Sequence, residues 1–210
     1  MEDVLEVYSR PYDADQPVVC MDEKPYQLLD DRIKPIKMDK KNHKKKVDCE
    51  YERQGSCSIF ISTEPLGGWR DVMAFPQRTS EDWAYRMKWL ADEVYSNAKK
   101  IVLVMDNLNT HTTASFYKVF SPEEAFRLSQ RYEIHYTPKH GSWLNMAELE
   151  LSALSIQCLG ERRIKSLDDL NLQLSAWHTY RNAAQKGIDW QFTTADARIK
   201  LKHLYPSVVF

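Results

Sequence analysis

The chain has 210 residues, of which 43% are hydrophobic and 28% are charged, a composition that is typical of a soluble globular domain and excludes an intrinsically disordered protein. Its formal net charge of −1 argues against a protein that binds DNA through bulk positive charge. The apolar runs are too short to span a bilayer, no leader peptide follows Met1, and the four cysteines form no CxxC pair, so we expect a cytoplasmic protein without a zinc site.

Residues 1–16 are expected to form a short N-terminal helix followed by a linker. The apolar run Val18–Met21 then predicts a buried strand that ends at Asp22. A proline-containing, lysine-rich connection is expected from there to about Asp48. It holds six lysines between positions 37 and 46, a cluster that is either a solvated loop or a surface for DNA phosphates.

The next part of the chain shows two strands and a helix. Residues 50–62 and 69–75 flank a turn with proline and glycine, which predicts an antiparallel pair of strands. Thr79 followed by Asp82 resembles a capping box, and apolar residues then recur at helical spacing to about Ser96. A helix is therefore expected after the strand pair.

The second half of the chain continues the alternation of strands and helices. Ile101–Met105 predicts a second buried strand, which ends at Asp106. Residues 113–131 predict helical structure broken near Pro122, because proline fits the first turn of a helix and not its interior. Three further elements are predicted: a short strand at 134–136, a helix from about 143 to 159 that Gly160 terminates, and a last helix from Ser166 to about Gly187.

This order of elements predicts an α/β fold with a mixed sheet flanked by helices. We expect residues 17–187 to form this domain and residues 188–210 to form a C-terminal tail.

Two of the predicted strands end in an aspartate, Asp22 and Asp106. Sites gather at the carboxyl ends of strands in such sheets, so these carboxylates lie side by side if the strands are neighbours. Two close carboxylates repel each other unless a cation lies between them, and a site with only oxygen ligands suits Mg²⁺ or Mn²⁺. The alternative is that both aspartates are turn residues or helix caps.

A third acid is expected from the helix that follows the third strand. Asn145, Glu148, Ser152 and Ser155 are spaced three, four and three residues apart, so they share one helix face. Small polar residues around one glutamate are typical of a helix that lines a metal pocket. Glu150 is the alternative, but its helical neighbours are apolar, and we expect it to make a surface ion pair. Three such acids suit phosphodiester cleavage, in which two divalent ions roughly 3.5–4 Å apart hold the attacking and leaving oxygens.

Three motifs in chain order resemble those of a transposase family. They are VCMDEKP at Val19–Pro25, MDNLNTH at Met105–His111 and YTPKHGSWLNMAE at Tyr136–Glu148. Together they resemble the mariner-like branch of the DDE superfamily endonucleases, in particular the transposases of bacterial insertion sequences. The resemblance runs from near residue 3 to about residue 182, and three motifs in the right order make it specific.

This resemblance implies an RNase H-like fold with a mixed five-stranded sheet flanked by helices. It also implies that Asp22, Asp106 and Glu148 are catalytic and hold two Mg²⁺ or Mn²⁺ ions in an enzyme that cuts and joins DNA for transposition. The segment LNMAE matches the LNxxE element of the family, which favours Glu148 over Glu150 independently of the helix-face pattern.

Further residues are expected around the acids or along the DNA. Five are interpreted as neighbours of the acids or as DNA-positioning groups: Glu23, Asn107, His111, His140 and Asn145. His111 can instead cap the following helix, and His140 can be a plain loop residue. Nine basic residues are expected to contact DNA phosphates: Lys37, Lys40, Lys41, Lys44, Lys45, Lys46, Arg162, Arg163 and Lys165.

The expected partner is DNA, both the transposon ends and the target, with a homodimer in the active complex on a bacterial or archaeal nucleoid. Members of the family carry an N-terminal helix-turn-helix region, whereas this sequence begins just before the predicted catalytic domain. A separate or missing region is therefore expected to recognise the transposon ends. Two alternatives stay open: a stand-alone RNase H-like nuclease, and a non-catalytic DNA-binding subunit derived from a transposase.

Overall fold

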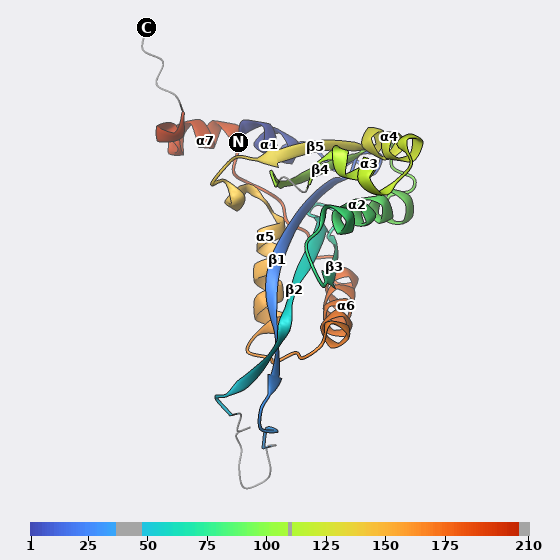
Figure 1. Cartoon of the computed structure of the whole chain (residues 1–210). Coiled ribbons are helices and arrows are strands. Elements are labelled where there is room, and N and C mark those ends of the chain that lie inside the picture. Colours follow the sequence, from blue (N-terminus) through green and yellow to red (C-terminus); the bar gives the residue numbers. More distant parts are fainter. Residues whose placement is uncertain (37–47, 109–110, 206–210) are drawn as a thin grey trace.

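The computed structural model describes residues 1–36, 48–108 and 111–205, so the lysine cluster at 37–46 lies outside the described residues. Within this part of the chain, five strands form one sheet in the order β3-β2-β1-β4-β5 (Figure 1). The strands are β1 (Val18–Asp31), β2 (Tyr51–Glu64), β3 (Trp69–Phe75), β4 (Ile101–Asp106) and β5 (Tyr132–Thr137). The expected mixed five-stranded sheet is confirmed.

The register of the central strands brings two predicted strand ends together. β2 runs antiparallel to its neighbours β1 and β3, whereas β4 and β5 run parallel to β1. The pairing of β1 with β4 ends at Cys20 opposite Val104. Asp22 and Asp106 each come two residues after this last pair, so they lie at the same edge of the parallel part of the sheet.

The first strand does not end at Asp22, and this prediction was wrong. β1 continues to Asp31, paired throughout with β2, and the two form a long arm that projects from the body of the sheet (Figure 1). β4 pairs with β1 only as far as Cys20, so beyond that residue one edge of β1 has no strand neighbour among the described residues. Proline has no backbone N–H to donate to a neighbouring strand. Pro25 is tolerated because no strand pairs with that edge of β1 at this position in the described residues.

Helices cover both faces of the sheet (Figure 1). The helices are α1 (Glu2–Tyr8), α2 (Ser80–Trp89), α3 (Phe116–Val119), α4 (Pro122–Arg131), α5 (Ala147–Leu154), α6 (Leu167–Ala183) and α7 (Thr194–Lys200). Shorter turns are η1 (Leu90–Val94), η2 (Thr113–Ser115), η3 (Ser142–Leu144), η4 (Ser155–Leu159) and η5 (Lys202–Leu204), of which η1 and η4 are π-helical. None of the described helices is long and apolar enough to cross a membrane.

Alternate residues of the central strands enter two separate hydrophobic cores. Val19 and Met21 pack with side chains of α2, α3 and α4, whereas Cys20 packs with α1, α5 and α6. In β4, Val102 and Val104 likewise enter the core on the α5 side. A strand that is buried on both faces has a continuous run of apolar residues. This is why the start of β1 and the whole of β4 could be predicted from the sequence.

Most of the predicted helix ends are confirmed. The capping box of Thr79 and Asp82 opens α2, Pro122 occupies the first turn of α4, and the Ser166 hydroxyl caps α6. The helix predicted from residue 143 begins only at Ala147, because η3 precedes it and the extended backbone of Asn145 separates the two. α7 was not predicted.

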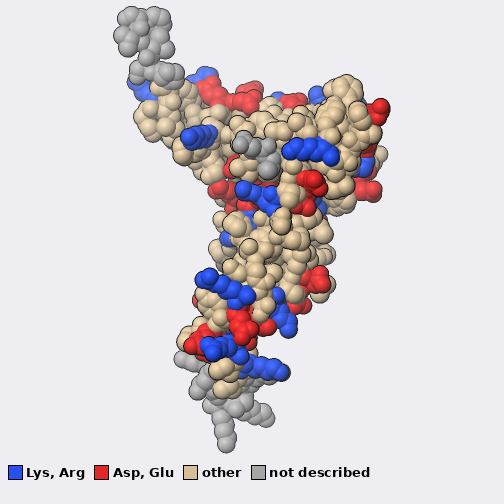
Figure 2. All heavy atoms as spheres, in the orientation of Figure 1, with Lys and Arg blue, Asp and Glu red and all other residues tan. Residues whose placement is uncertain are grey.

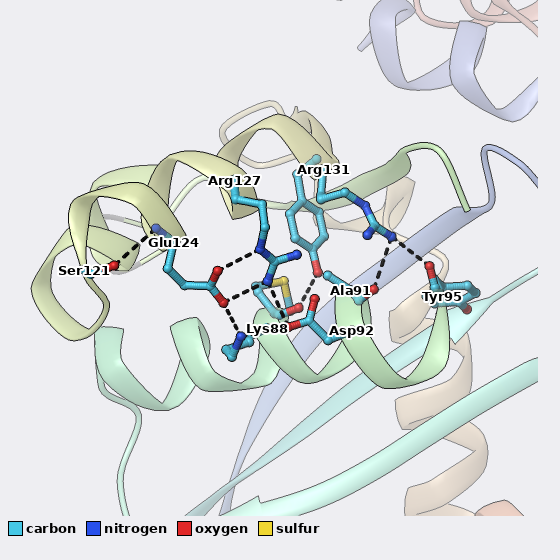
Figure 3. A network of polar contacts seen from close by, with 10 residues as sticks. Lys88, Ala91, Asp92, Tyr95, Ser121, Glu124, Arg127 and Arg131 are labelled. Carbon is cyan, nitrogen blue, oxygen red and sulfur yellow. Dashed lines mark hydrogen bonds and ion pairs between the residues drawn. The ribbon is translucent and has the colours of Figure 1, made fainter. Parts of the chain in front are cut away.

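The helices α2, η1 and α4 form a layer on one face of the sheet, and ion pairs between their side chains connect them. Lys88 and Arg127 bridge the carboxylates of Glu124 and Asp92 (Figure 3). Arg131 donates to the carbonyl oxygens at the end of this helical layer. The network fixes α4 against α2 on the face of the sheet opposite α5.

Candidate active site

Three predicted acids meet on one face of the sheet. Asp22 has the same strand parity as Cys20, and Asp106 the same parity as Val104, so both side chains face α5. Glu148 comes from the first turn of α5 itself. All three line one open cleft of about 710 Å³, together with residues from β1, η3, α5 and η4: Glu23, Lys24, Pro25, Ser142, Leu151, Ser152, Ser155 and Ile156.

The electrostatics of the cleft reflect its burial and the mutual repulsion of its acids. Burial raises the pKa of Asp22 to about 7, and the negative charges of Asp106 and Glu148 contribute to the rise. The backbone N–H of Glu23 donates to Asp22 Oδ1 at 2.7 Å and opposes it. The Thr137 hydroxyl donates to Asp106 Oδ1 at 2.6 Å and fixes that carboxylate at the end of β4. These are conditions that a divalent cation relieves.

The cleft offers carboxylate oxygens from Asp22, Asp106 and Glu148, and none of the described His or Cys residues lines it. Oxygen donors of this kind fit a hard divalent cation. Across the described ranges, however, no three His, Cys, Asp or Glu side chains converge closely enough to hold an ion in the conformation they have. The cleft is therefore an open acidic site and not a closed ligand cage.

Asn145 connects the third acid to the first strand. Its side-chain amide donates to the Met21 carbonyl oxygen at 2.8 Å, and its Oδ1 accepts from the backbone N–H of Ala147 at 3.1 Å. The residue is buried and does not line the cleft, so the predicted polar stripe holds for Glu148, Ser152 and Ser155 but not for Asn145. Asn145 instead ties the start of α5 to β1 beside Asp22.

Glu23 and His111 pair on the opposite face of the sheet. Strand parity turns Glu23 towards α2, where His111 Nε2 lies 2.6 Å from Glu23 Oε1 and Arg78 Nε lies 3.2 Å from Oε2. The His111 ring stacks on Trp83, with 5.7 Å between the ring centroids. His111 therefore joins β1 to α2, and the N-cap of the turn that follows is Thr112.

A second cavity adjoins the acidic cleft. It has a volume of about 380 Å³ and shares Asp106 and Ser142 with the first. Asn107 and His140 both line it, as does Lys139. His140 is exposed and has a φ of 64°, in the tight turn that precedes η3. Asp106 therefore borders both cavities.

Glu150 does not make the surface ion pair that was expected. Its side chain is 2% exposed and lies between Arg70 Nε at 3.2 Å and Arg181 Nη2 at 2.9 Å. Arg70 comes from β3 and Arg181 from α6, two elements that pack against each other. The expectation was wrong because a buried acid needs cationic partners, and local periodicity does not reveal partners from distant elements.

The second basic cluster divides into two kinds of residue. Arg163 pairs with Asp31 at 2.9 Å and donates to the carbonyl oxygens of Asp48 and Glu50, so its guanidinium holds the arm of β1 and β2. Arg162 and Lys165 are exposed. Figure 2 shows basic and acidic side chains intermixed around this arm on the face in view. The expected contacts of Lys37, Lys40, Lys41, Lys44, Lys45 and Lys46 lie outside the described residues.

Among the lining residues that the sequence analysis did not assign to the site, Lys24 is the charged one. Lys24 lines it and donates from Nζ to the Ser155 hydroxyl at 2.6 Å. The signal was present, because a residue two positions after Asp22 in a strand points to the same face. The predicted strand ended at Asp22, and this concealed the relation.

Comparison with known proteins places this geometry in a family. The sequence profile of the DDE superfamily endonucleases matches residues 17–171. No curated protein matches the chain. Among solved structures, the Mos1 mariner paired end complex with Mn has a TM-score of 0.55 and 15% identity, over 84% of this chain and 52% of that one. The paired end complex with Mg has a TM-score of 0.55 and 13% identity, over 88% and 55%.

The chain thus spans about half of the Mos1 chains that it matches. At these identities the likeness shows the fold, which is the RNase H-like fold that the motifs implied. The profile match covers all three acids and both strands that carry the aspartates. On this evidence the chain belongs to the DDE superfamily endonucleases.

Proposed function

We propose that this chain is the catalytic part of a DNA transposase, which cleaves DNA at transposon ends and joins the freed ends to target DNA. The observation that carries the proposal is the meeting of Asp22, Asp106 and Glu148 in one open cleft of a DDE-family chain. Three separate elements supply these acids, so the sheet and α5 must both be in place for the site to exist.

Asp22, Asp106 and Glu148 are the proposed ligands of two Mg²⁺ or Mn²⁺ ions. When bound, such ions supply an activated nucleophile and relieve the charge on the leaving oxygen. The raised pKa of Asp22 and the oxygen-only donor set support this assignment.

The surrounding residues hold these acids in place. The Thr137 hydroxyl orients the Asp106 carboxylate, and the backbone N–H of Glu23 orients that of Asp22. Asn145 fixes the start of α5 against β1 and so sets the position of Glu148. The DNA strand lies along the acidic cleft and the adjoining cavity, where Asn107, Lys139 and His140 reach its backbone.

The proposed partners are DNA and a second copy of this chain, on the nucleoid in the cytoplasm. The Mos1 structures support DNA as partner, because they are paired end and strand transfer complexes of that transposase. Base-specific recognition of transposon ends is assigned to a helix-turn-helix region outside this catalytic fold. Phosphate contacts of the kind offered by Arg162 and Lys165 carry no sequence information directly.

The test is nicking of supercoiled plasmid in Mg²⁺, in Mn²⁺ and in EDTA, followed by joining of a labelled oligonucleotide with a free 3′-hydroxyl to the plasmid. We expect both reactions with either ion and neither in EDTA. Cleavage without joining favours a stand-alone RNase H-like nuclease. Full activity in EDTA overturns the proposal, and an inactive but DNA-binding chain favours a non-catalytic subunit.

A further inference from the structure

We propose that Lys24 is a phosphate-binding residue of the acidic cleft, whose ammonium donates to a non-bridging oxygen of the DNA strand held beside the acids. The inference rests on the proposed function, because it requires DNA to occupy this cleft. It adds a cationic contact to a site that the sequence motifs describe only by its acids.

The position of Lys24 follows from the strand that carries the first acid. Lys24 lies two residues after Asp22 in β1, so both side chains leave the sheet on the α5 side. Both line the same cleft as Asp106 and Glu148. A cation and three carboxylates therefore share one open cavity, with the cation on the side towards the β1–β2 arm.

The Ser155 hydroxyl holds the ammonium in place. Ser155 Oγ accepts from Lys24 Nζ at 2.6 Å and donates its own proton to the Leu151 carbonyl oxygen at 2.7 Å. The hydroxyl proton is thus directed away from Lys24, and the oxygen is free to act as acceptor. Ser155 is the first residue of the π-helical turn η4, and such turns occur frequently at functional sites.

The unused hydrogen-bond donors of the Lys24 ammonium indicate that it binds an anion. An ammonium group has three N–H donors, and the Ser155 hydroxyl takes one of them. The ion pairs found among the described residues include Glu23 with Arg78 and His111, but none that involves Lys24. A half-buried ammonium in an open cleft, with donors to spare and no carboxylate at ion-pair distance, matches the needs of a phosphate oxygen.

The experiment compares Lys24→Met with Lys118→Met. Lys118 is an exposed lysine that also contacts a serine hydroxyl, at 3.4 Å from Ser80 Oγ, and it lies outside the cleft. Binding of a short duplex is measured at several salt concentrations in Ca²⁺, so that affinity is separated from cleavage. Lys24→Arg keeps the charge, and Ser155→Ala removes only the group that holds the ammonium.

We expect Lys24→Met to weaken binding by about tenfold or more, the factor for one lost hydrogen bond between charged groups. The slope of log affinity against log salt falls in magnitude by about 0.9, the change for one phosphate contact. Lys118→Met leaves both unchanged, Lys24→Arg keeps the slope, and Ser155→Ala has a smaller effect than Lys24→Met. A lysine with a purely structural role lowers the melting temperature without changing the slope.

Two outcomes separate this inference from the proposed function. If the wild-type chain binds no duplex, both are overturned. If the wild-type chain binds and nicks DNA while a folded Lys24→Met variant keeps the wild-type affinity and slope, only the Lys24 inference is overturned.

Discussion

Carboxylates serve opposite purposes in the two helical layers of this protein. On the α4 side, Arg127 and Lys88 hold the pKa of Glu124 down at about 2, and the acid is part of a paired network (Figure 3). On the α5 side, burial raises the pKa of Asp22 to about 7, beside two further acids. The difference shows that the surroundings of an acid, and not its residue type, decide its role. Cationic neighbours make Glu124 part of a structural network, whereas burial beside other acids makes Asp22 part of a site that attracts cations.

The largest expected effect comes from substituting the three acids of the cleft. Asp22→Asn, Asp106→Asn and Glu148→Gln should each abolish plasmid cleavage, because each removes one ligand of the shared ions. Their circular dichroism and melting curves should stay close to those of the wild type. The matched control is Glu81→Gln, an exposed acid in the first turn of α2, which should cleave normally. An active Glu148→Gln would show that α5 does not supply the third ligand.

The second largest effect concerns Glu150, only two residues from Glu148. Glu150→Gln should destabilise the protein by about 3–5 kcal/mol, because it leaves the buried Arg70 and the half-buried Arg181 without their anionic partner. Urea unfolding measures this directly, with Glu148→Gln as the control on the same helix. A Glu150→Gln variant of wild-type stability would contradict the buried network and restore the surface pair that the sequence suggested.

Glu148 and Glu150 also show what could and could not be predicted from the sequence. The helical stripe and the LNxxE element both selected Glu148, and the structure places it in the cleft. The surroundings of Glu150 could not be predicted, because its partners lie on β3 and α6, far away along the chain. Local periodicity indicates which face of a helix is apolar. It does not indicate which charged residues from distant elements contact that face.

The strands give a similar lesson. Val18–Met21 and Ile101–Met105 were visible because burial on both faces makes a strand continuously apolar. The part of β1 beyond Asp22 was not visible, because it is a polar strand whose pairing with β2 depends on residues around Tyr51. Lys24 was missed for the same reason. The predicted fold class was right because it depends on the buried strands, whereas details of the site depend on the exposed one.

A third prediction compares the two layers through metal binding. Mg²⁺ or Mn²⁺ at ten times its dissociation constant should stabilise the wild type by about 1.4 kcal/mol, since the ion binds the folded cleft and not the unfolded chain. Asp22→Asn should lose most of this gain. Glu124→Gln, which changes the paired network, should keep it. The measurement is the melting temperature with and without the ion, and equal gains in all three proteins would place the ion elsewhere.

The smallest effect is expected from the paired network itself. The pKa of Glu124 is lowered from 4.5 to about 2, chiefly by hydrogen bonds from Arg127 and Lys88. A lowered pKa means that the folded state holds the charged form more tightly than the unfolded state. The stabilisation is therefore fully present above about pH 4.5 and is lost as the pH falls towards about 2. For a network this close to solvent, about 0.5–1 kcal/mol is expected.

The measurement is the difference in unfolding free energy between the wild type and Glu124→Gln, followed from neutral pH down to about pH 3. The difference should shrink over this range, because protonation of Glu124 removes the same charge that the substitution removes. Glu123→Gln is the control, since this neighbouring acid is exposed in the same first turn of α4. A difference that stays constant with pH would mean that Glu124 stabilises α4 by packing, and the contrast between paired and unpaired acids would then rest on the cleft alone.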